Sequence, residues 1–298
     1  MYQASTATAR LLPVSRVLLA LFVLLTLLGF GSLFVLAGQT DRSFAWTIDP
    51  AATAAFLGAG YASGTVLVVL TLRENTWAAA RTPIVTVLLF TVLTLIATLL
   101  HLDRFHFGEG GLPRAAAWFW TVVYVLIPLG MLAALVVQER DRRRDAAPGG
   151  WATARTPGAG LPRTLRAALL VEGVVMLAVG VVLYLAPGTA QALWPWTLTP
   201  LTARAVASWL IAYGVATALV VGENDLRRLR APAVAYAVFG AAQLVVALRF
   251  AGDAAWGVPA GVGYLLVAAA VTATGVLAHL LGRRAAGPGA LAEVRRAR

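Results

Sequence analysis

The chain has 298 residues, of which 60% are hydrophobic and 12% charged, with a net charge of +11 and a mean hydropathy of +0.80. Because an average soluble domain is about 45–50% apolar and about 25% charged, this composition is typical of an integral membrane protein. The absence of cysteine excludes disulfides, thiolate metal sites, iron–sulfur clusters and cysteine nucleophiles.

Eight apolar segments follow one another along the chain. They comprise residues 17–37, 51–72, 82–102, 115–138, 167–186, 201–222, 231–248 and 255–281. Each is close to the roughly 20 residues that a helix needs to cross a hydrocarbon core of about 30 Å. The first is longer than the apolar region of a signal peptide, which is about 7–15 residues, so we expect it to be retained. The sequence therefore predicts an all-α integral membrane protein with eight transmembrane helices.

The arginines are distributed unevenly between the two ends of these segments. All 24 basic residues are arginines, and only five lie near the ends predicted to be outside: Arg42, Arg104, Arg114, Arg204 and Arg249. The positive-inside rule therefore places both termini in the cytoplasm, and we expect a multi-pass protein of a bacterial inner membrane. The cytoplasmic arginines are expected to contact anionic lipid head groups, and no nucleic-acid partner is expected.

The two halves of the chain carry similar motifs in the same order. The first set is Trp46, Asp49, Pro50, Glu74, Asn75, Arg81 and Pro83, and the second is Trp196, Thr199, Pro200, Glu223, Asn224, Arg230 and Pro232. The tryptophans are 150 positions apart (46 and 196) and the glutamates 149 (74 and 223). Because each unit holds an even number of spans, two copies would share one orientation and be related by a pseudo-twofold axis along the membrane normal.

This repeat predicts the domain organisation. Two tandem, parallel-oriented four-helix transmembrane repeats are expected at residues 1–137 and 164–284. Residues 138–163 are charged and then rich in proline, glycine and alanine, which is typical of a flexible cytoplasmic linker. Residues 285–298 form a basic cytoplasmic tail.

Several repeated residues have a structural interpretation. The Asp49-Pro50 and Thr199-Pro200 pairs are typical of a helix N-cap followed by proline at the first helical position. Thr82-Pro83 has the same pattern before the third span. In each half, a glutamate and an arginine seven residues apart are expected to bridge or cap the helix ends at the turn between the second and third spans.

Aromatic and small residues predict further contacts. The aromatic residues Phe44, Trp46, Trp194 and Trp196 are expected at the outer membrane interface, where amphipathic rings are favoured. Gly60 with Gly64, and Gly257 with Gly261, form GxxxG patterns that allow close helix packing. These faces are expected between the halves or between two protomers, so a homodimer is possible.

Ionisable groups inside a span are costly and point to function. Glu172 lies six residues beyond Arg166, about 9 Å along a helix, and is either an ion-pair partner of a neighbouring arginine or a carboxylate that binds protons or cations. Arg204 either snorkels to the interface or forms an anion site with nearby threonine hydroxyls at a helix N-terminus. The candidate substrate-binding residues are Glu172, Arg204, Thr199, Thr202, Tyr213, Tyr236 and Gln243, of which the last three are expected to line a polar cavity.

Motifs for catalysis and cofactors are sparse. The chain has no GxSxG, HExxH or Walker motif. His101 and His106, near Asp103 and Glu109, do not match a recognised zinc spacing, and no histidine lies deep enough in facing spans for a bis-histidine haem site. We therefore expect no enzymatic activity, metal or cofactor.

Two functions remain after these exclusions. The first is a transporter or channel for a small hydrophobic, amphipathic or anionic solute or a lipid. The alternative is a non-catalytic accessory or structural subunit of a larger membrane protein complex.

Overall fold

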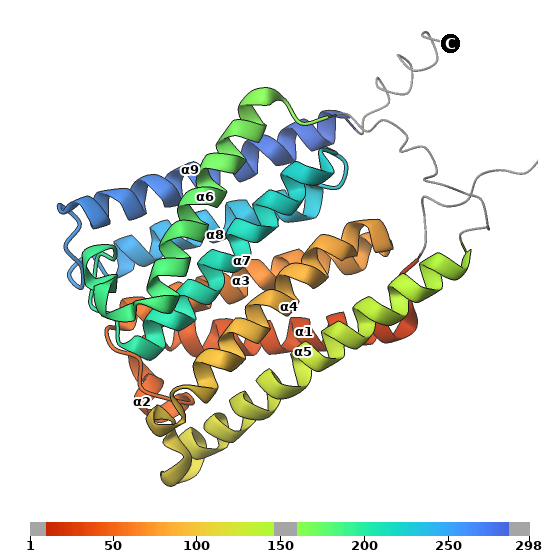
Figure 1. Ribbon diagram of the computed structural model, residues 1–298. Coiled ribbons are helices and arrows are strands. Elements are labelled where there is room, and N and C mark those ends of the chain that lie inside the picture. Colours follow the sequence, from red (N-terminus) through yellow and green to blue (C-terminus); the bar gives the residue numbers. More distant parts are fainter. Residues whose placement is uncertain (1–9, 146–159, 286–298) are drawn as a thin grey trace, which may run out of the picture.

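The protein is an all-helical membrane protein (Figure 1). The computed structural model describes residues 10–145 and 160–285, except for the side chains of residues 142–145, 190 and 191. Within these ranges eight helices are long and apolar enough to cross a membrane, which confirms the predicted number of spans. They are α1 (Pro13–Phe30, continued by the π-helical turn Gly31–Val35), α3 (Ala51–Glu74), α4 (Trp77–Leu99), α5 (Gly111–Asp145), α6 (Arg163–Leu185), α7 (Pro200–Glu223), α8 (Arg230–Arg249) and α9 (Pro259–Ala285).

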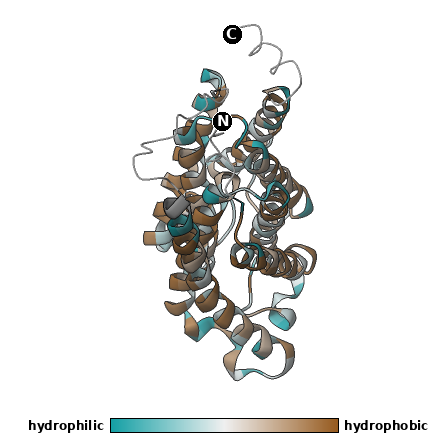
Figure 2. Ribbon diagram, turned by 90° about the vertical axis from the view of Figure 1, so that its right-hand side faces the viewer, coloured by the Kyte–Doolittle hydropathy of each residue, from teal (hydrophilic) through white to brown (hydrophobic). Residues whose placement is uncertain are grey.

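Short helices lie at the opposite end of the bundle from the turns between α3 and α4 and between α7 and α8. They are Ala37–Gln39, α2 (Thr40–Ser43), Leu102–Arg104, His106–Gly108 and Pro187–Ala192. In the described residues the only β-type contact is an isolated bridge between Arg10 and Thr76. Figure 2 shows hydrophobic residues along the bundle and hydrophilic residues gathered at its two ends, as expected for a chain that crosses a bilayer.

Four helices form the centre of the bundle. The central helices are α3, α4, α7 and α8, with α1 and α5 on one side and α6 and α9 on the other (Figure 1). Residues 10–145 are called the first half and residues 160–285 the second half below. α3 packs extensively against α8 of the second half, and α7 packs to a similar extent against α4 of the first half. The two halves are therefore joined by their central helices rather than at their edges.

Gly60 of α3 allows one of these close contacts between the halves. A Cβ atom at Gly60 would lie 2.6 Å from Cε2 of Trp209 in α7, whereas one at Gly64 would meet its nearest neighbours at an ordinary 3.6 Å. Trp209 also packs against the ring of Phe90, with centroids 3.9 Å apart. The first GxxxG pattern thus lies between the halves, while Gly261 of the second packs against the backbone of its own preceding loop.

Helix starts confirm one predicted cap and correct two. Thr199 caps α7 as predicted: its side chain accepts a hydrogen bond from the amide of Thr202, and Pro200 occupies the first helical position. The Asp49-Pro50 prediction was wrong, because Pro50 itself is the N-cap of α3 and there is no side-chain cap. The Thr82 prediction was also wrong.

α4 begins five residues before Thr82. Thr76 is its N-cap and accepts from the amide of Ala79, and Pro83 lies inside the helix. Proline is tolerated there because it falls in the second turn, where its missing amide hydrogen removes only one helical bond, the one to the carbonyl of Ala79.

The aromatic loops at residues 44–46 and 194–196 are buried rather than exposed at an interface with lipid, which is where the sequence predicted them. Trp46, Trp194 and Trp196 are each less than 8% exposed. Trp46 packs edge-on against Trp120, and Trp196 donates its indole N–H to the Thr53 hydroxyl at 2.8 Å. The loops that carry these rings fold inward between helix ends, so the rings form part of the core and contribute to joining the two halves.

The end of α5 extends into the predicted linker. Residues 138–145 continue the helix, and Gln138 is only 1% exposed. Its side-chain oxygen accepts from the Leu12 amide at 3.0 Å and from the Ser15 hydroxyl at 3.3 Å, and its amide nitrogen donates to the Arg10 carbonyl. These bonds attach the start of α1 to α5. Most of the linker (146–159) and the predicted basic tail (286–298) lie outside the described residues.

Candidate functional site

The buried carboxyl of Glu172 is the centre of the candidate site. Glu172 lies on α6, nine residues after the helix begins at Arg163, which is about 14 Å along the axis. Glu172 is 7% exposed. Oε1 accepts from the hydroxyl of Thr274 in α9 at 2.7 Å, and Oε2 accepts from the hydroxyl of Tyr236 in α8 at 3.0 Å. Three helices therefore converge on one carboxyl group.

Among the described residues no cation lies within ion-pair distance of Glu172. The carboxyl is held by two neutral hydroxyl groups instead. The interpretation of Glu172 as the ion-pair partner of a neighbouring arginine therefore finds no support in this geometry. A carboxylate in a membrane span with only neutral donors keeps a full negative charge, which is unfavourable unless a proton or a cation neutralises it.

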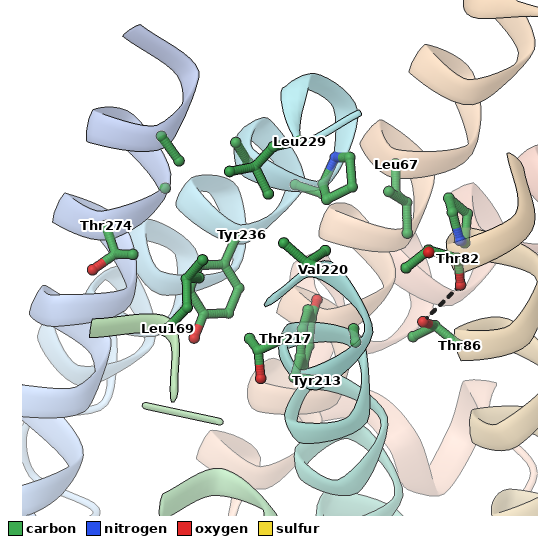
Figure 3. Close-up of a pocket in the computed structure, with 17 residues that line it drawn as sticks. Leu67, Thr82, Thr86, Leu169, Tyr213, Thr217, Val220, Leu229, Tyr236 and Thr274 are labelled. Carbon is green, nitrogen blue, oxygen red and sulfur yellow. Dashed lines mark hydrogen bonds between the residues drawn. The ribbon is translucent and has the colours of Figure 1, made fainter. Parts of the chain in front are cut away.

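A cavity lies directly beside this carboxyl, and both hydroxyl donors are part of its wall. The cavity has a volume of about 60 Å³, and we call it the central cavity. Its walls come from α3, α4, α6, α7, α8 and α9, so it lies where the two halves meet (Figure 3). Because a water needs about 10–15 Å³ of such space, the cavity has room for a few water molecules.

The lining of the central cavity combines apolar side chains with hydroxyl groups. The apolar part includes Leu67, Leu169, Val220 and Leu229. The hydroxyl groups belong to Thr82, Thr86, Tyr213, Thr217, Tyr236 and Thr274, and Figure 3 shows them around the same space. Gly173, next to Glu172, permits this arrangement, because a side chain there would collide with Thr217 of α7.

Tyr213 connects the cavity to the first half. Its hydroxyl donates to the Ser63 hydroxyl of α3 at 2.7 Å, and Ser63 in turn donates to the carbonyl of Ala235 in α8 at 2.7 Å. The ring of Tyr213 stacks on Phe239 with centroids 4.2 Å apart. The structure therefore places Tyr213 and Tyr236 in the wall of one cavity with Glu172 behind it, whereas the sequence predicted a polar cavity that also included Gln243.

A smaller hollow adjoins the central cavity at the end of the bundle that carries the α3–α4 and α7–α8 turns. Its volume is about 10 Å³, and it shares Thr82, Val220, Leu229 and Pro232 with the cavity. Glu223, Asp225 and Arg228 also line it. Glu223 accepts a hydrogen bond from the Thr82 hydroxyl of the opposite half at 3.1 Å. The predicted bridges between Glu74 and Arg81 and between Glu223 and Arg230 do not form ion pairs within 4 Å in the described structure.

Arg204, Thr199 and Thr202 lie apart from this cavity, at the other end of the bundle. Arg204 donates to Nε2 of His101 at 3.1 Å, and Nδ1 of His101 donates to the Ala97 carbonyl at 2.9 Å. The hydroxyls of Thr199 and Thr202 form the reciprocal capping box of α7. These side chains thus have partners within the protein, and the geometry gives no support to the predicted anion site.

Gln243 is also separate from the central cavity. Its amide nitrogen donates to the Phe56 carbonyl at 3.2 Å, and its oxygen accepts from the Tyr264 hydroxyl at 2.7 Å. The side chain is 2% exposed, so Gln243 links α8 to α3 and α9 within the core. It does not line a cavity together with Tyr213 and Tyr236.

The histidines near the end of α4 do not converge. Nδ1 of His106 donates to the Phe44 carbonyl at 3.0 Å, and its Nε2 lies 3.1 Å from the Thr47 hydroxyl. His101 faces Arg204 instead. In the described part of the chain no three His, Asp or Glu side chains gather closely enough to hold a metal ion.

A second cavity of about 100 Å³ lies within the first half, between α1, α3, α4 and α5. The hydroxyls of Tyr61 and Tyr124 in its wall are hydrogen-bonded to each other. Its rim includes Leu28 and Phe119, which are more than half exposed. No carboxylate or arginine lines this cavity, and its wall combines aromatic and aliphatic side chains with the hydroxyls of Thr26, Ser32, Ser43 and Thr91.

Several residues of the central cavity were not predicted from the sequence. Thr274, Thr217 and Thr82 line it, and Ser63 orients Tyr213. Threonine and serine are common inside membrane helices, where they bond to the preceding turn, so their identity gives no signal by itself. Only the positions of the neighbouring helices distinguish Thr274 from any other threonine.

The comparisons with known proteins found no match. No family model fits the chain, and neither a curated protein nor a solved structure is significantly similar to it. A functional conclusion therefore depends on the geometry of the site.

Proposed function

We propose that the protein is a secondary transporter of a small, mostly apolar or amphipathic solute. The central cavity is its binding site, and Glu172 is the group that binds and releases a proton as the solute moves. The observation that carries this proposal is a carboxyl group buried in a span, one hydrogen bond behind the wall of a cavity between the two halves. Such a group is costly at this depth, so a role in ion coupling is the default hypothesis.

The lining of the central cavity supports the proposed class of solute. Most of the wall is aliphatic, and its polar groups are neutral hydroxyls, which suits a solute with one or two hydrogen-bonding groups on an apolar body. An anionic solute is disfavoured because the nearest charged group is itself a carboxyl. The present volume of about 60 Å³ holds only a few waters, so the halves must move apart to admit a solute.

A tandem repeat of four plus four helices would provide two such mobile units. Corresponding features of the two halves support it. The Ala45 and Pro195 carbonyls accept from the amides of His106 and Ala255 respectively, each at 3.0 Å. Asn75 and Asn224 both end their helices with φ near +50°.

The chain that precedes the first helix of each half also bonds to these asparagines. The Leu11 amide donates to the Asn75 carbonyl, and the Leu161 amide donates to the Asn224 side chain. The crossed packing of α3 on α8 and of α7 on α4 is what a pseudo-twofold axis between the two halves would produce.

The orientation of this transporter follows from its arginines. We place both termini in the cytoplasm of a cell with an inner membrane, because the arginine-rich ends of the helices then face inward. These ends carry the turns at 75–76 and 224–229 and the end of α9, and we call them the arginine-rich side. The central cavity and its adjoining hollow lie toward this side.

The experiment is a proton-movement assay in proteoliposomes. The purified protein is reconstituted around a trapped pH-sensitive dye, and a panel of small neutral amphipaths and organic cations is added outside. A solute that is transported with coupling changes the internal pH in the wild type and leaves it unchanged with Glu172→Gln. The matched control, Glu74→Gln, changes a carboxyl that lines neither hollow and should behave as the wild type does. Equal solute-driven pH changes in Glu172→Gln and the wild type would contradict the proposal.

The alternative is a non-catalytic subunit of a larger membrane complex or a homodimer. The observation in its favour is the strongly exposed apolar surface of α1 and α5, where Val17, Leu24 and Leu126 are each more than half exposed. Lipid covers such a surface equally well. Isolation from native membranes with a stoichiometric protein partner, together with no solute-driven pH change, would favour this alternative.

A further inference from the structure

Glu223 is partly exposed to solvent and also contacts the opposite half of the protein. It is the last residue of α7 and is partly buried, and its carboxylate accepts a hydrogen bond from Thr82 of α4 at 3.1 Å. A carboxylate at a helix C-terminus is disfavoured by the helix dipole. Nothing in the capping of α7 requires it, because Asn224 ends the helix in the left-handed conformation. Its contact with Thr82 therefore calls for another explanation.

The first turns of α4 provide additional acceptors at this point. Pro83 has no amide hydrogen, so the carbonyl of Ala79 lacks its helical donor. Ala79 lines the same small hollow as Glu223, and Thr82 lines both this hollow and the central cavity. Thr86 donates to the Thr82 carbonyl at 2.9 Å and also lines the central cavity. Polar groups thus continue from the hollow into the cavity.

The opposite wall of the central cavity completes a polar connection from Glu223 to Glu172. Tyr236 and Thr274 line it and are the two donors to Glu172. Water in a cavity of about 60 Å³ has the hydroxyls of Thr82 and Thr86 on one side and those of Tyr236 and Thr274 on the other. Each of these groups is both a donor and an acceptor, which is what a chain of proton transfers requires.

The groups that contact Glu172 in the described structure are neutral hydroxyls, and both line the central cavity and belong to this connection. From α8 the carboxyl meets Tyr236, from α9 the hydroxyl of Thr274, and from α7 the cavity wall presents Tyr213. On its own helix, Arg163 and Arg166 lie at the arginine-rich end, and neither is within ion-pair distance in the described structure. Toward the other end of the bundle the cavity wall has the ring of Tyr213, which stacks on Phe239 and Trp209 behind it.

We propose that Glu172 exchanges its proton with the arginine-rich side through the water-filled central cavity, Thr82 and Glu223. This inference rests on the proposed role of Glu172. It adds the route that the proton takes and the side of the membrane with which it exchanges. In each exchange the O–H bond of the Glu172 carboxyl breaks and an O–H bond forms on a cavity water. A proton moves from the far end of the chain to the Glu223 carboxylate, which passes it to the solvent. The hydroxyls of Thr82 and Tyr236 each give up one proton and receive another, so they are unchanged.

The experiment measures exchange of this proton directly. Infrared spectra of the full-length protein in a lipid film are followed after H₂O is replaced by D₂O, and the carboxyl band of Glu172 is assigned by its absence in Glu172→Gln. Glu223→Gln and Thr82→Val should each slow the shift of this band by about tenfold, the factor expected for loss of one hydrogen bond to a charged group. Thr82→Ser keeps the hydroxyl and should restore the wild-type rate.

Glu74→Gln is the matched control, because Glu74 ends α3 as Glu223 ends α7 but does not line the hollow. Its exchange rate should equal that of the wild type. Unchanged exchange in both Glu223→Gln and Thr82→Val would overturn the route, and so would the absence of any Glu172 carboxyl band at all pH values. Slowed exchange in a protein that moves no protons with any solute would keep the route and reject transport. Solute-driven pH changes together with unaltered proton exchange would keep transport and reject the route.

Discussion

Gly60→Ala should weaken the contact between the two halves of the bundle. The added Cβ would lie 2.6 Å from Cε2 and 2.7 Å from Cδ2 of Trp209. The indole cannot easily retreat, because Phe90 packs against it with ring centroids 3.9 Å apart. Overpacking of this kind costs about 1–3 kcal/mol. The alanine recovers about 0.5–1 kcal/mol through its better helix propensity.

Gly64→Ala supplies the matched control one turn further along α3. Its Cβ would lie 3.6 Å from Thr26 and 3.7 Å from Trp209, which is ordinary contact. Both substitutions gain the same helix propensity, so the difference between them isolates the collision. We expect Gly60→Ala to be less stable than Gly64→Ala by about 2 kcal/mol, which is roughly 30-fold in the unfolding equilibrium.

The assay is reversible unfolding in mixed micelles at increasing mole fractions of a denaturing detergent, followed by circular dichroism. Trp209→Leu removes the indole ring, so Gly60→Ala should cost little stability in that background. Equal stability of the two alanine variants, or an undiminished cost of Gly60→Ala without the indole, would refute the proposed contact between α3 and α7.

Three further experiments test individual contacts. Thr199→Ala removes the capping box of α7 and should cost about 1 kcal/mol in the same unfolding assay, whereas Asp49→Ala, at a position with no side-chain cap, should not. Arg204 and His101 should show a coupling of about 0.5 kcal/mol in a double-mutant cycle, since their contact joins the halves. A coupling of zero would show that this contact does not stabilise the protein. Tyr236→Phe deletes one donor to Glu172 and should cost about 0.6 kcal/mol, while an unchanged carboxyl band in infrared spectra would show that the bond is not made.

The number and approximate positions of the spans could be predicted because they depend on local hydrophobicity and length. The Thr199-Pro200 cap is equally local and was predicted correctly. The start of α4 was not, because Pro83 is tolerated inside the helix while Thr76 provides the cap. Proline marks a helix start only when no better capping residue precedes it at short distance.

The candidate site was predicted only in part, for a reason that lies in the central helices. At least half of the apolar stretch in each of α3, α4, α7 and α8 is buried by neighbouring helices, so no polar face fixes the rotation of these helices. Glu172 was identified because a carboxylate inside a span is rare. The hydroxyls of Thr274 and Thr82 depend on how α9 and α4 are turned, which the sequence alone does not determine.

Cysteine labelling tests the central claim, which is that a cavity beside Glu172 is reached by water from the arginine-rich side. The natural chain has no cysteine, so Thr217→Cys introduces one thiol into the cavity wall without background. Ser208→Cys, at a fully buried position that lines no cavity described here, is the control. A small charged thiol reagent added without solute to sealed vesicles of each orientation should label position 217 faster from the arginine-rich side than from the opposite side, and should leave position 208 unlabelled. Labelling of position 217 only from the opposite side, or not at all under conditions that label an exposed cysteine, would contradict the account.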